Sequence, residues 1–354
     1  MRPGPRLPRQ RRGHDPRGAR IRKGGGSRRD GRGHPAPGTG APACGRSLRP
    51  GRGGRLRRRQ RYQRRGHPGL LPPPRLQRRR PLPEAEPRVR PATTGAPPIG
   101  SPYDIATLRQ LNALTSQFYE REAASFSATR QAPWRGWNRA LDIIAQTDGT
   151  FRRHPLAVLD LACGNLRFER FLAERRVPIA SVVAIDNCPA LLDAPDSAVA
   201  FRSCDLIEAL IADDFRASLP RATCDLAVAF GFMHHVAAFP LRIHVLEGLL
   251  DSLRPGGFAV VSFWQFLHDD RIAAKAATTT AAGRRAWRLP PLASCDYLLG
   301  WQHADGVYRF CHHTTDEEID RLMAAVALPF REVARFSADG KHGNLNRYLV
   351  LQRP

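Results

Sequence analysis

Hydrophobic residues alternate between strand-like and helix-like patterns from residue 104 onward. Short uninterrupted apolar runs indicate strands that are buried on both faces, as in a parallel sheet. Such runs predict strands at 156–162, 181–186, 199–204, 224–230 and 258–264. Between them, apolar residues spaced by three and four predict helices at 165–176 and 239–253. This alternation is typical of an α/β fold.

Helix start signals flank the alternating region on both sides. Asp104 is expected to cap a first helix, and a second helix is expected over 134–146. Farther along, Thr314 with Glu317 predicts a capping box for a helix that reaches Ala327. The chain therefore places helices before and after its run of strands.

The last strands differ in direction from the earlier ones. A turn at 254–257 leads into the strand at 258–264, and turn residues at 339–343 separate two final strands at 331–337 and 346–352. Strands joined by so short a turn pair antiparallel. The predicted fold is an α/β, Rossmann-like sheet, mostly parallel with an antiparallel C-terminal hairpin and with helices on both faces.

The stretch 157–165 combines a buried strand, a turn containing glycine and the start of a helix. Open α/β sheets bind nucleotide-like cofactors with this arrangement. Asp160 stands near the end of this strand, and Asp186 ends the next one. A carboxylate at the second position can accept hydrogen bonds from both hydroxyls of a ribose. The two acids favour an adenosine-type ligand without a 2′-phosphate.

The excess of positive charge lies entirely in the first hundred residues. They hold 28 of the 56 Lys and Arg residues but 4 of the 32 Asp and Glu residues, so the net charge of +24 arises there. With 18 Gly and 18 Pro, residues 1–100 are predicted to be disordered. The same Pro and Gly content disfavours the amphipathic helix of a transit peptide. An RNA-binding arm and a segment from an upstream start in the wrong frame both stay open.

Cysteine spacing and hydropathy exclude several classes of protein. The seven cysteines show no C-x-x-C spacing, so no disulfide framework or zinc knuckle is indicated. Cys311, His312 and His313 are consecutive, and a strand would point them to alternate faces, so no metal is expected. No apolar run is long enough to span a bilayer and no secretory signal is visible. We expect a cytoplasmic protein without a membrane or DNA partner.

The ordered motifs resemble those of class I S-adenosylmethionine-dependent methyltransferases. Residues 160–166 resemble the cofactor loop of that family, 224–231 its fourth strand, and 254–257 the turn before its fifth. The resemblance implies S-adenosylmethionine as cofactor, with Asp160 at its amino acid end, Asp186 at the ribose and Asp205 at the adenine amine. The implied cofactor-binding residues are Asp160, Ala162, Gly164, Asn165, Asp186, Asp205 and Phe230. It also implies a methyltransferase domain at 151–354, preceded by a helical cap at 101–150.

One position departs from the pattern of that family. Its loop commonly carries three glycines, and Ala162 and Leu166 stand at the outer two positions here. A positive φ at Leu166 would cost about 1–2 kcal/mol in a residue other than glycine. We therefore expect a strained loop that still binds the cofactor.

A narrower resemblance is to the tRNA wobble-uridine carboxymethyl methyltransferases, over roughly 105–353. It is carried by Phe118-Tyr119, by 126–130, by Pro133-Trp134 and by the His-His segment 233–236. The resemblance implies esterification of a carboxymethyl group on the wobble uridine of tRNA. It also implies a small zinc-binding activating protein as a partner.

The residue types of the motifs suit this chemistry. A carboxylate nucleophile is ionised at pH 7 and needs a cation to hold it, for which Arg130 and Arg309 are the candidates. A hydroxyl or amine acceptor would instead need a base, which His234 or His235 can supply. Arg130 could otherwise pair with Glu122, and the histidines could simply bond to backbone.

Two other functions remain as alternatives. One is an O-methyltransferase of a small metabolite that carries a carboxylate or hydroxyl. The other is a non-catalytic RNA-binding or scaffold protein with a methyltransferase fold, in which Leu166 would mark a lost cofactor site.

Overall fold

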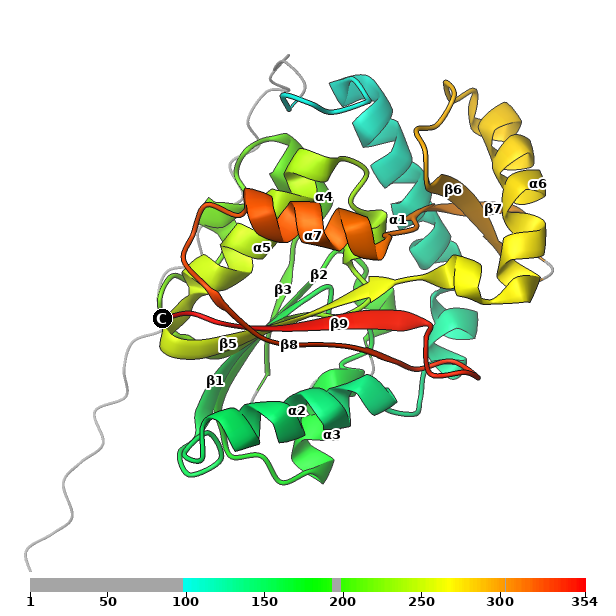
Figure 1. Cartoon of the computed structure of the whole chain (residues 1–354). Coiled ribbons are helices and arrows are strands. Elements are labelled where there is room, and N and C mark those ends of the chain that lie inside the picture. Colours follow the sequence, from blue (N-terminus) through cyan, green and yellow to red (C-terminus); the bar gives the residue numbers. More distant parts are fainter. Residues whose placement is uncertain (1–97, 193–198, 303) are drawn as a thin grey trace, which may run out of the picture. The chain divides into compact units, whose positions relative to one another are not determined.

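A sheet of seven strands in the order β3–β2–β1–β4–β5–β9–β8 forms the centre of the fold in the computed structural model (Figure 1). The structure describes residues 98–192, 199–302 and 304–354, so the expectations for residues 1–97 lie outside it. The strands of the sheet are β1 Leu156–Leu161, β2 Ile179–Asp186, β3 Val199–Ser203, β4 Cys224–Ala229, β5 Leu253–Trp264, β8 Arg331–Ala338 and β9 Asn346–Gln352. The predicted mostly parallel α/β sheet is confirmed.

The register of the sheet places β1 at its functional centre. Asp160 on β1 pairs with Ala184 on β2 and with Val228 on β4, and both pairings are parallel. From β1 the chain continues outward to β2 and β3 on one side and to β4 and β5 on the other, and open α/β sheets bind ligands at such a reversal of strand order. β9 runs antiparallel between β5 and β8, as predicted. The turn predicted at 254–257 is wrong, because β5 already begins at Leu253. The pairing with β4 shifts register there, and Gly256 has a φ of +82°.

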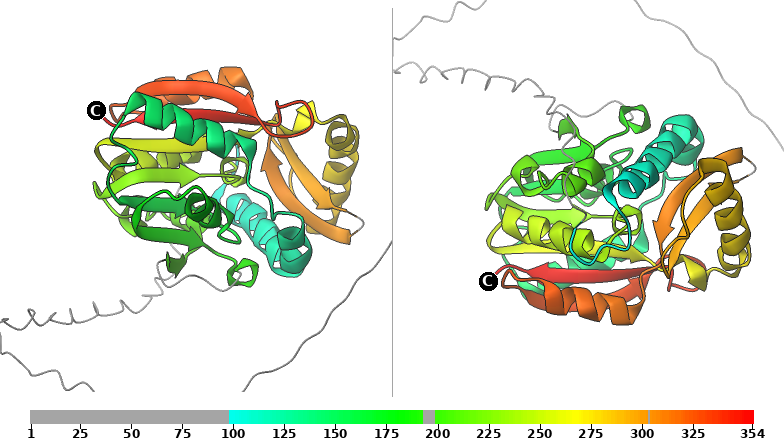
Figure 2. Two further views of the ribbon diagram at one scale, coloured as in Figure 1. Left: turned by 90° about the horizontal axis from the view of Figure 1, so that it is seen from below. Right: turned by 90° about the horizontal axis from the view of Figure 1, so that it is seen from above.

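Helices cover both faces of the sheet (Figure 2). They are α1 Ile105–Ala128, α2 Arg135–Thr147, α3 Arg167–Glu174, α4 Leu206–Ile211, α5 Phe239–Ser252, α6 Asp270–Trp287 and α7 Asp316–Ala325. Alternate residues of a strand face opposite sides, so Val158 and Val228 pack with α2 and α3, whereas Leu159 and Ala229 pack with α4 and α5. None of the helices in the described ranges is long and apolar enough to cross a membrane.

A second, two-stranded sheet packs beside α1. Its strands are β6 Asp296–Trp301 and β7 Ala304–His312, and they pair antiparallel. α6 covers the outer side of this hairpin, where a Cβ added at Gly283 would lie 2.8 Å from the Leu298 side chain. The hydrophobic pattern predicted neither this hairpin nor α4 and α6.

The predicted capping box of Thr314 and Glu317 is wrong by one residue. Thr315 caps α7, and its hydroxyl accepts a hydrogen bond from the Glu318 amide at 3.2 Å. Thr314 is fully buried instead. The Glu318 carboxylate turns into the core and bonds to His312 at 2.6 Å, because a buried imidazole competes for it with the helix start.

A carboxylate in the β8–β9 turn joins α2 to the sheet. Asp339 accepts hydrogen bonds from the Tyr348 hydroxyl at 2.5 Å, from the Asn346 amide at 2.9 Å and from the Gly136 backbone at 3.2 Å. A Cβ at Gly136 would lie 2.2 Å from the Tyr348 ring, so only glycine fits this start of α2. The junction fixes Trp134, just before α2, in the wall of the cavity described below.

Candidate active site

A cavity of about 560 Å³ lies at the carboxyl ends of β1, β2 and β4, with α1 and β7 contributing to its walls. The sequence analysis singled out residues from six separate segments of the chain. All of them line this cavity: Arg130, Asp160, Ala162, Gly164, Asn165, Asp186, Asp205, Phe230, His234, His235 and Arg309. The structure thus brings every candidate residue to one site.

The loop between β1 and α3 is wound into a left-handed conformation at three alternate residues. Ala162 has a φ of 59°, Gly164 of 56° and Leu166 of 57°. These are the positions at which a glycine is expected, and two of them carry side chains. Leu166 also buries its side chain in the core beside Phe168 and Phe171, with 5% of it exposed. Packing therefore offsets the strain of this residue.

Two buried carboxyl groups meet below this loop. Burial raises the pKa of Asp160 well above its usual range, and the nearby Glu169 carboxyl, in the first turn of α3, raises it further. Within the described residues, neither oxygen of Glu169 receives a hydrogen bond from an N–H or hydroxyl group. Of the two, Asp160 lines the cavity, and its carboxyl group suits a cationic amine, such as the ammonium group at the amino acid end of S-adenosylmethionine. The sequence analysis did not single out Glu169, although an acid in the first turn after the loop was visible.

The other two acids are held by backbone and by α1. Asp186 accepts hydrogen bonds from the amides of Gly164 at 2.9 Å and Cys188 at 2.8 Å, and burial raises its pKa. Asp205 caps α4 and accepts a hydrogen bond from the Asn112 amide of α1 at 2.8 Å. Both carboxylates line the cavity where the ribose and adenine of the cofactor are expected.

Asn165 and Phe230 have structural partners besides their place in the wall. The Asn165 amide donates to the Ser127 hydroxyl and to the Arg130 carbonyl, both at 3.1 Å, and so ties the loop to the end of α1. The Phe230 ring lies 4.9 Å from the Phe168 ring and belongs to an aromatic cluster over α3. These contacts hold the cavity open from two sides.

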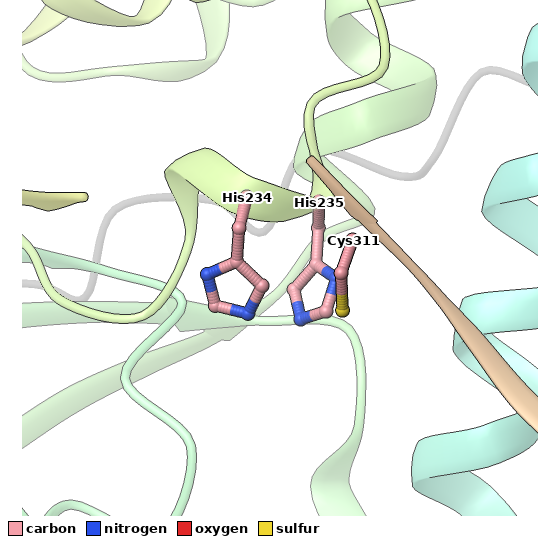
Figure 3. Close-up of side chains that lie close together, drawn as sticks. All are labelled: His234, His235 and Cys311. Atoms are coloured by element: carbon pink, nitrogen blue, oxygen red, sulfur yellow. The ribbon is translucent and has the colours of Figure 1, made fainter. Parts of the chain in front are cut away.

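Two imidazoles, His234 and His235, line the cavity and lie next to each other (Figure 3). His235 bonds to the Phe310 carbonyl at 2.7 Å and to the Tyr119 hydroxyl at 2.9 Å. Burial and the nearby Arg309 lower the pKa of His235 to about 3. His234 has no partner for Nδ1 among the described residues, and burial holds its pKa well below the usual range. Both imidazoles are therefore neutral at physiological pH.

Two guanidinium groups line the same cavity. Aromatic rings surround Arg309 of β7, whose guanidinium carbon lies 4.8 Å from the ring of Phe118, 5.3 Å from Trp264 and 5.4 Å from Trp301. Its Nε has no hydrogen-bond partner in the described part of the chain. Arg130 lies over Phe126 at 5.0 Å. The rings desolvate both cations without neutralising them.

The alternative pairing of Arg130 with Glu122 is not seen. Glu122 accepts a hydrogen bond from Ser125 at 2.6 Å, while Arg130 contacts the Thr129 hydroxyl at 3.3 Å. Burial and the proximity of Arg309 lower the pKa of Arg130, which still leaves it charged at neutral pH. The aromatic residues around these cations were not recognised as a unit, because they come from α1, β5 and β6.

Potential metal ligands gather here in a different set from the consecutive one considered in the sequence. Ligand atoms of His234, His235 and Cys311 lie within 4.8 Å of one another (Figure 3). Burial raises the pKa of the Cys311 thiol to about 12, so it keeps its proton, and the Arg309 guanidinium is close by. His312 points away and bonds to Asp296 at 2.5 Å. The fixed positive charge of Arg309 beside these three ligand atoms opposes the binding of a metal ion.

Known proteins match part of the chain. Residues 158–257 match the family model of a methyltransferase domain. The chain is 26% identical over 149 residues to the mouse tRNA (carboxymethyluridine(34)-5-O)-methyltransferase ALKBH8, a match covering 42% of this chain and 19% of that protein. The Macaca fascicularis protein of the same name is 26% identical over 168 residues, covering 48% and 22%. The chain thus spans about a fifth of the length of these curated relatives.

The solved structures that resemble the chain include two methyltransferases. The 1,6-didemethyltoxoflavin-N1-methyltransferase of Burkholderia thailandensis is 18% identical, with a TM-score of 0.44 over 73% of this chain and 94% of that one. The magnesium protoporphyrin IX methyltransferase of Synechocystis is 12% identical, with a TM-score of 0.41 over 69% and 97%.

The family match, the strand order and the acid-lined loop together define a class I methyltransferase domain. The cofactor of such a domain is S-adenosylmethionine, and the chain resembles the tRNA wobble-uridine carboxymethyl methyltransferases over 149 residues. Leu166 has the positive φ from which a strained loop was expected, and binding of the cofactor by this loop stays a prediction.

Proposed function

We propose that this methyltransferase esterifies the carboxylate of a carboxymethyl group on the wobble uridine of tRNA. The observation that carries the proposal is the pair of desolvated guanidinium groups, Arg130 and Arg309, at the acceptor end of the cavity. A guanidinium forms two parallel hydrogen bonds with a carboxylate and leaves a lone pair free for attack. The similar ALKBH8 proteins are methyltransferases of carboxymethyluridine at position 34 of tRNA, which supports the choice of a carboxymethyluridine here.

The histidines support a substrate that is already ionised. A hydroxyl or amine acceptor must lose a proton, and a general base works best with a pKa near the operating pH. His235, with a pKa of about 3, is a poor base, and both of its nitrogens already have partners. A carboxylate has a reference pKa of about 4 and needs no base at pH 7. S-adenosylmethionine supplies the electrophilic methyl group, so the task of the protein is alignment.

The residues divide this task between them. Arg309 and Arg130 hold the carboxylate from β7 and from the end of α1. His235, fixed between Tyr119 and the backbone of β7, shapes the floor of the acceptor site as a neutral group. Asp160 provides the carboxyl group for the other end of the cofactor. No proton transfer is required of any of these side chains.

A deletion strain tests the proposal directly. Nucleosides from its tRNA, separated and identified by mass spectrometry, should show accumulation of carboxymethyluridine and loss of its methyl ester at the wobble position. Re-expression of the protein should restore the ester, and the Arg309→Gln variant should not. Unchanged wobble nucleosides would refute the tRNA assignment. In that case, methylation of small carboxylic acids by the purified protein would establish the small-metabolite alternative.

A further inference from the structure

α6 presents a cationic face on the outer side of the β6–β7 hairpin (Figure 2). Between 271 and 288 the chain contains no acidic residue. Its basic residues there are Arg271, Lys275, Arg284, Arg285 and Arg288. Residues 101–354 are neutral overall, so this excess of charge is a local feature of one helix. The acids of α6 are confined to its start, where Asp269 pairs with Arg271 at 3.2 Å and Asp270 opens the helix. Beyond this first turn, the charged residues of the helix are all basic, whereas solvent-exposed helix faces usually mix charges of both signs.

The charges form a stripe along the helix. With 3.6 residues per turn, Arg271, Lys275 and Arg285 project within about 80° of one another. All three side chains are exposed. Thr278 and Ala282 stand between them on the same stripe, and both are small. An extended polyanion can therefore approach the helix closely along its whole length.

The other side of α6 is not available to a ligand. Ala276 and Gly283 are buried there, and the Thr280 hydroxyl accepts a hydrogen bond from the Leu298 amide of β6 at 3.0 Å. A basic amphipathic helix that lies on a membrane must bury its apolar face in lipid. Here the hairpin already covers that face, so the free surface of α6 offers charge alone.

The stripe begins at the edge of the active-site cavity. Ile272 lines the cavity and is adjacent to Arg271 at the start of the stripe. From Arg271 to Arg285 the stripe extends about 21 Å at 1.5 Å per residue. It thus leads away from the acceptor end of the site, over a length that spans several phosphates of a nucleic acid strand.

We infer that the outer face of α6 binds the phosphate backbone of the RNA whose modified base enters the cavity. The inference rests on the proposed function for the identity of the RNA as tRNA. Phosphate contacts fix the position of a nucleic acid and carry no sequence information, so a smooth row of cations beside small residues suits them. The base is then recognised separately, inside the cavity.

Chemical modification of lysines in the full-length protein shows whether a ligand covers this surface. The only lysines in the sequence are Lys23, Lys275 and Lys341, so modification of Lys275 by an amine-reactive reagent is measured individually by mass spectrometry. A tRNA transcript with uridine at position 34 should lower its modification severalfold. Polyglutamate of equal charge, or anionic lipid vesicles, should protect it less. Unchanged reactivity of Lys275 at a tRNA concentration that saturates binding would overturn the inference, and so would better protection by either of the other two probes.

Charge-matched variants supply the second test. The variant Arg271→Gln/Lys275→Gln/Arg285→Gln should bind the transcript about 10- to 50-fold more weakly at 0.15 M salt, with a salt slope lower by about 2. The control is Arg153→Gln/Arg175→Gln/Arg331→Gln. It removes three exposed cations, one between α2 and β1, one directly after α3 and one at the start of β8, and should bind like the wild type. Equal binding by both variants would overturn the inference.

The two proposals fail in distinguishable ways. If the α6 variant loses tRNA binding while the deletion strain keeps normal wobble nucleosides, the surface stands and the proposed substrate does not. If the deletion strain accumulates carboxymethyluridine while the α6 variant binds and methylates tRNA like its control, the substrate stands and the surface does not.

Discussion

The left-handed backbone at Leu166 allows its strain and its packing to be measured separately. Its φ of 57° and ψ of 32° cost a side chain with a Cβ about 1–2 kcal/mol relative to the ordinary helical region. Its side chain is 5% exposed and packs against α3. Replacing a buried leucine by alanine costs about 2–5 kcal/mol. The free energy gained by packing thus exceeds the cost of strain, and the wild-type protein should be more stable than a variant with alanine or glycine at this position.

The two small residues differ in one respect that matters here. Leu166→Ala loses the packing and keeps the strain. Leu166→Gly loses the same packing but relieves the strain, while the greater freedom of glycine in the unfolded chain costs about 0.5–1 kcal/mol. Leu166→Gly should therefore be more stable than Leu166→Ala by about 0.5–1 kcal/mol.

Leu172 is the matched control, since it is also buried but lies within α3, the helix that Leu166 precedes, and has ordinary helical backbone. There, the alanine variant should be more stable than the glycine variant by about 1 kcal/mol. The free energies of unfolding come from urea titration of the full-length protein, followed by tryptophan fluorescence. The reasoning is refuted if alanine is the more stable replacement at both positions. Calorimetry on the same variants then shows whether relief of strain changes the affinity for S-adenosylmethionine.

Further predictions concern the α2 junction, the acceptor site and a buried imidazole. Gly136→Ala should lower the stability by about 1–3 kcal/mol in thermal unfolding, although alanine favours helices, because its Cβ would overlap the Tyr348 ring. Arg309→Lys should lower kcat/KM for tRNA at least about tenfold, since lysine loses the bidentate contact, with cofactor affinity unchanged by calorimetry. The methyl transfer rate should stay flat from about pH 6 to about pH 9, because the nucleophile is already ionised; a rise through neutral pH would indicate a base. Burial lowers the pKa of His312, but the carboxylates of Asp296 and Glu318 outweigh this effect and raise it above the usual value. The protonated imidazole therefore stabilises the folded protein below about pH 6.5, and this contribution is lost as the pH rises through the pKa of His312 in the folded protein. Urea unfolding at pH 6 and pH 9 should show that loss in the wild type and not in His312→Gln.

The sequence was informative wherever function depends on local patterns. Asp160 and Asp186 lie on two strands that follow each other in the chain. Because these strands pair in parallel, the two acids come to the same edge of the sheet. The cap at Asp104 is local as well, and its carboxylate accepts from the Thr107 amide at 2.7 Å. Such features depend on neighbours within a few residues and can be predicted.

The acceptor end could not be predicted in the same way. Its aromatic surroundings come from Phe118 on α1, Trp264 on β5 and Trp301 on β6, and only the packing of β7 beside α1 brings them around Arg309. The hairpin β6–β7 and α6 were missed because alanine and threonine dominate the helix, which weakens its hydrophobic period. Long-range placement, rather than residue type, decides the chemistry at this end.

Glu318 shows most clearly why a local motif can mislead. Along the sequence it is one of three acids in the first turn of α7, and its neighbour Glu317 was the one expected to cap the helix. In the fold it bonds to His312 at 2.6 Å and to Arg242 at 2.7 Å, both buried. Arg242 in turn donates to the Val236 carbonyl at 2.6 Å, directly after the two histidines of the cavity. A residue that the sequence assigns to a helix end thus supports the acceptor site, because buried charges must find partners wherever the fold supplies them.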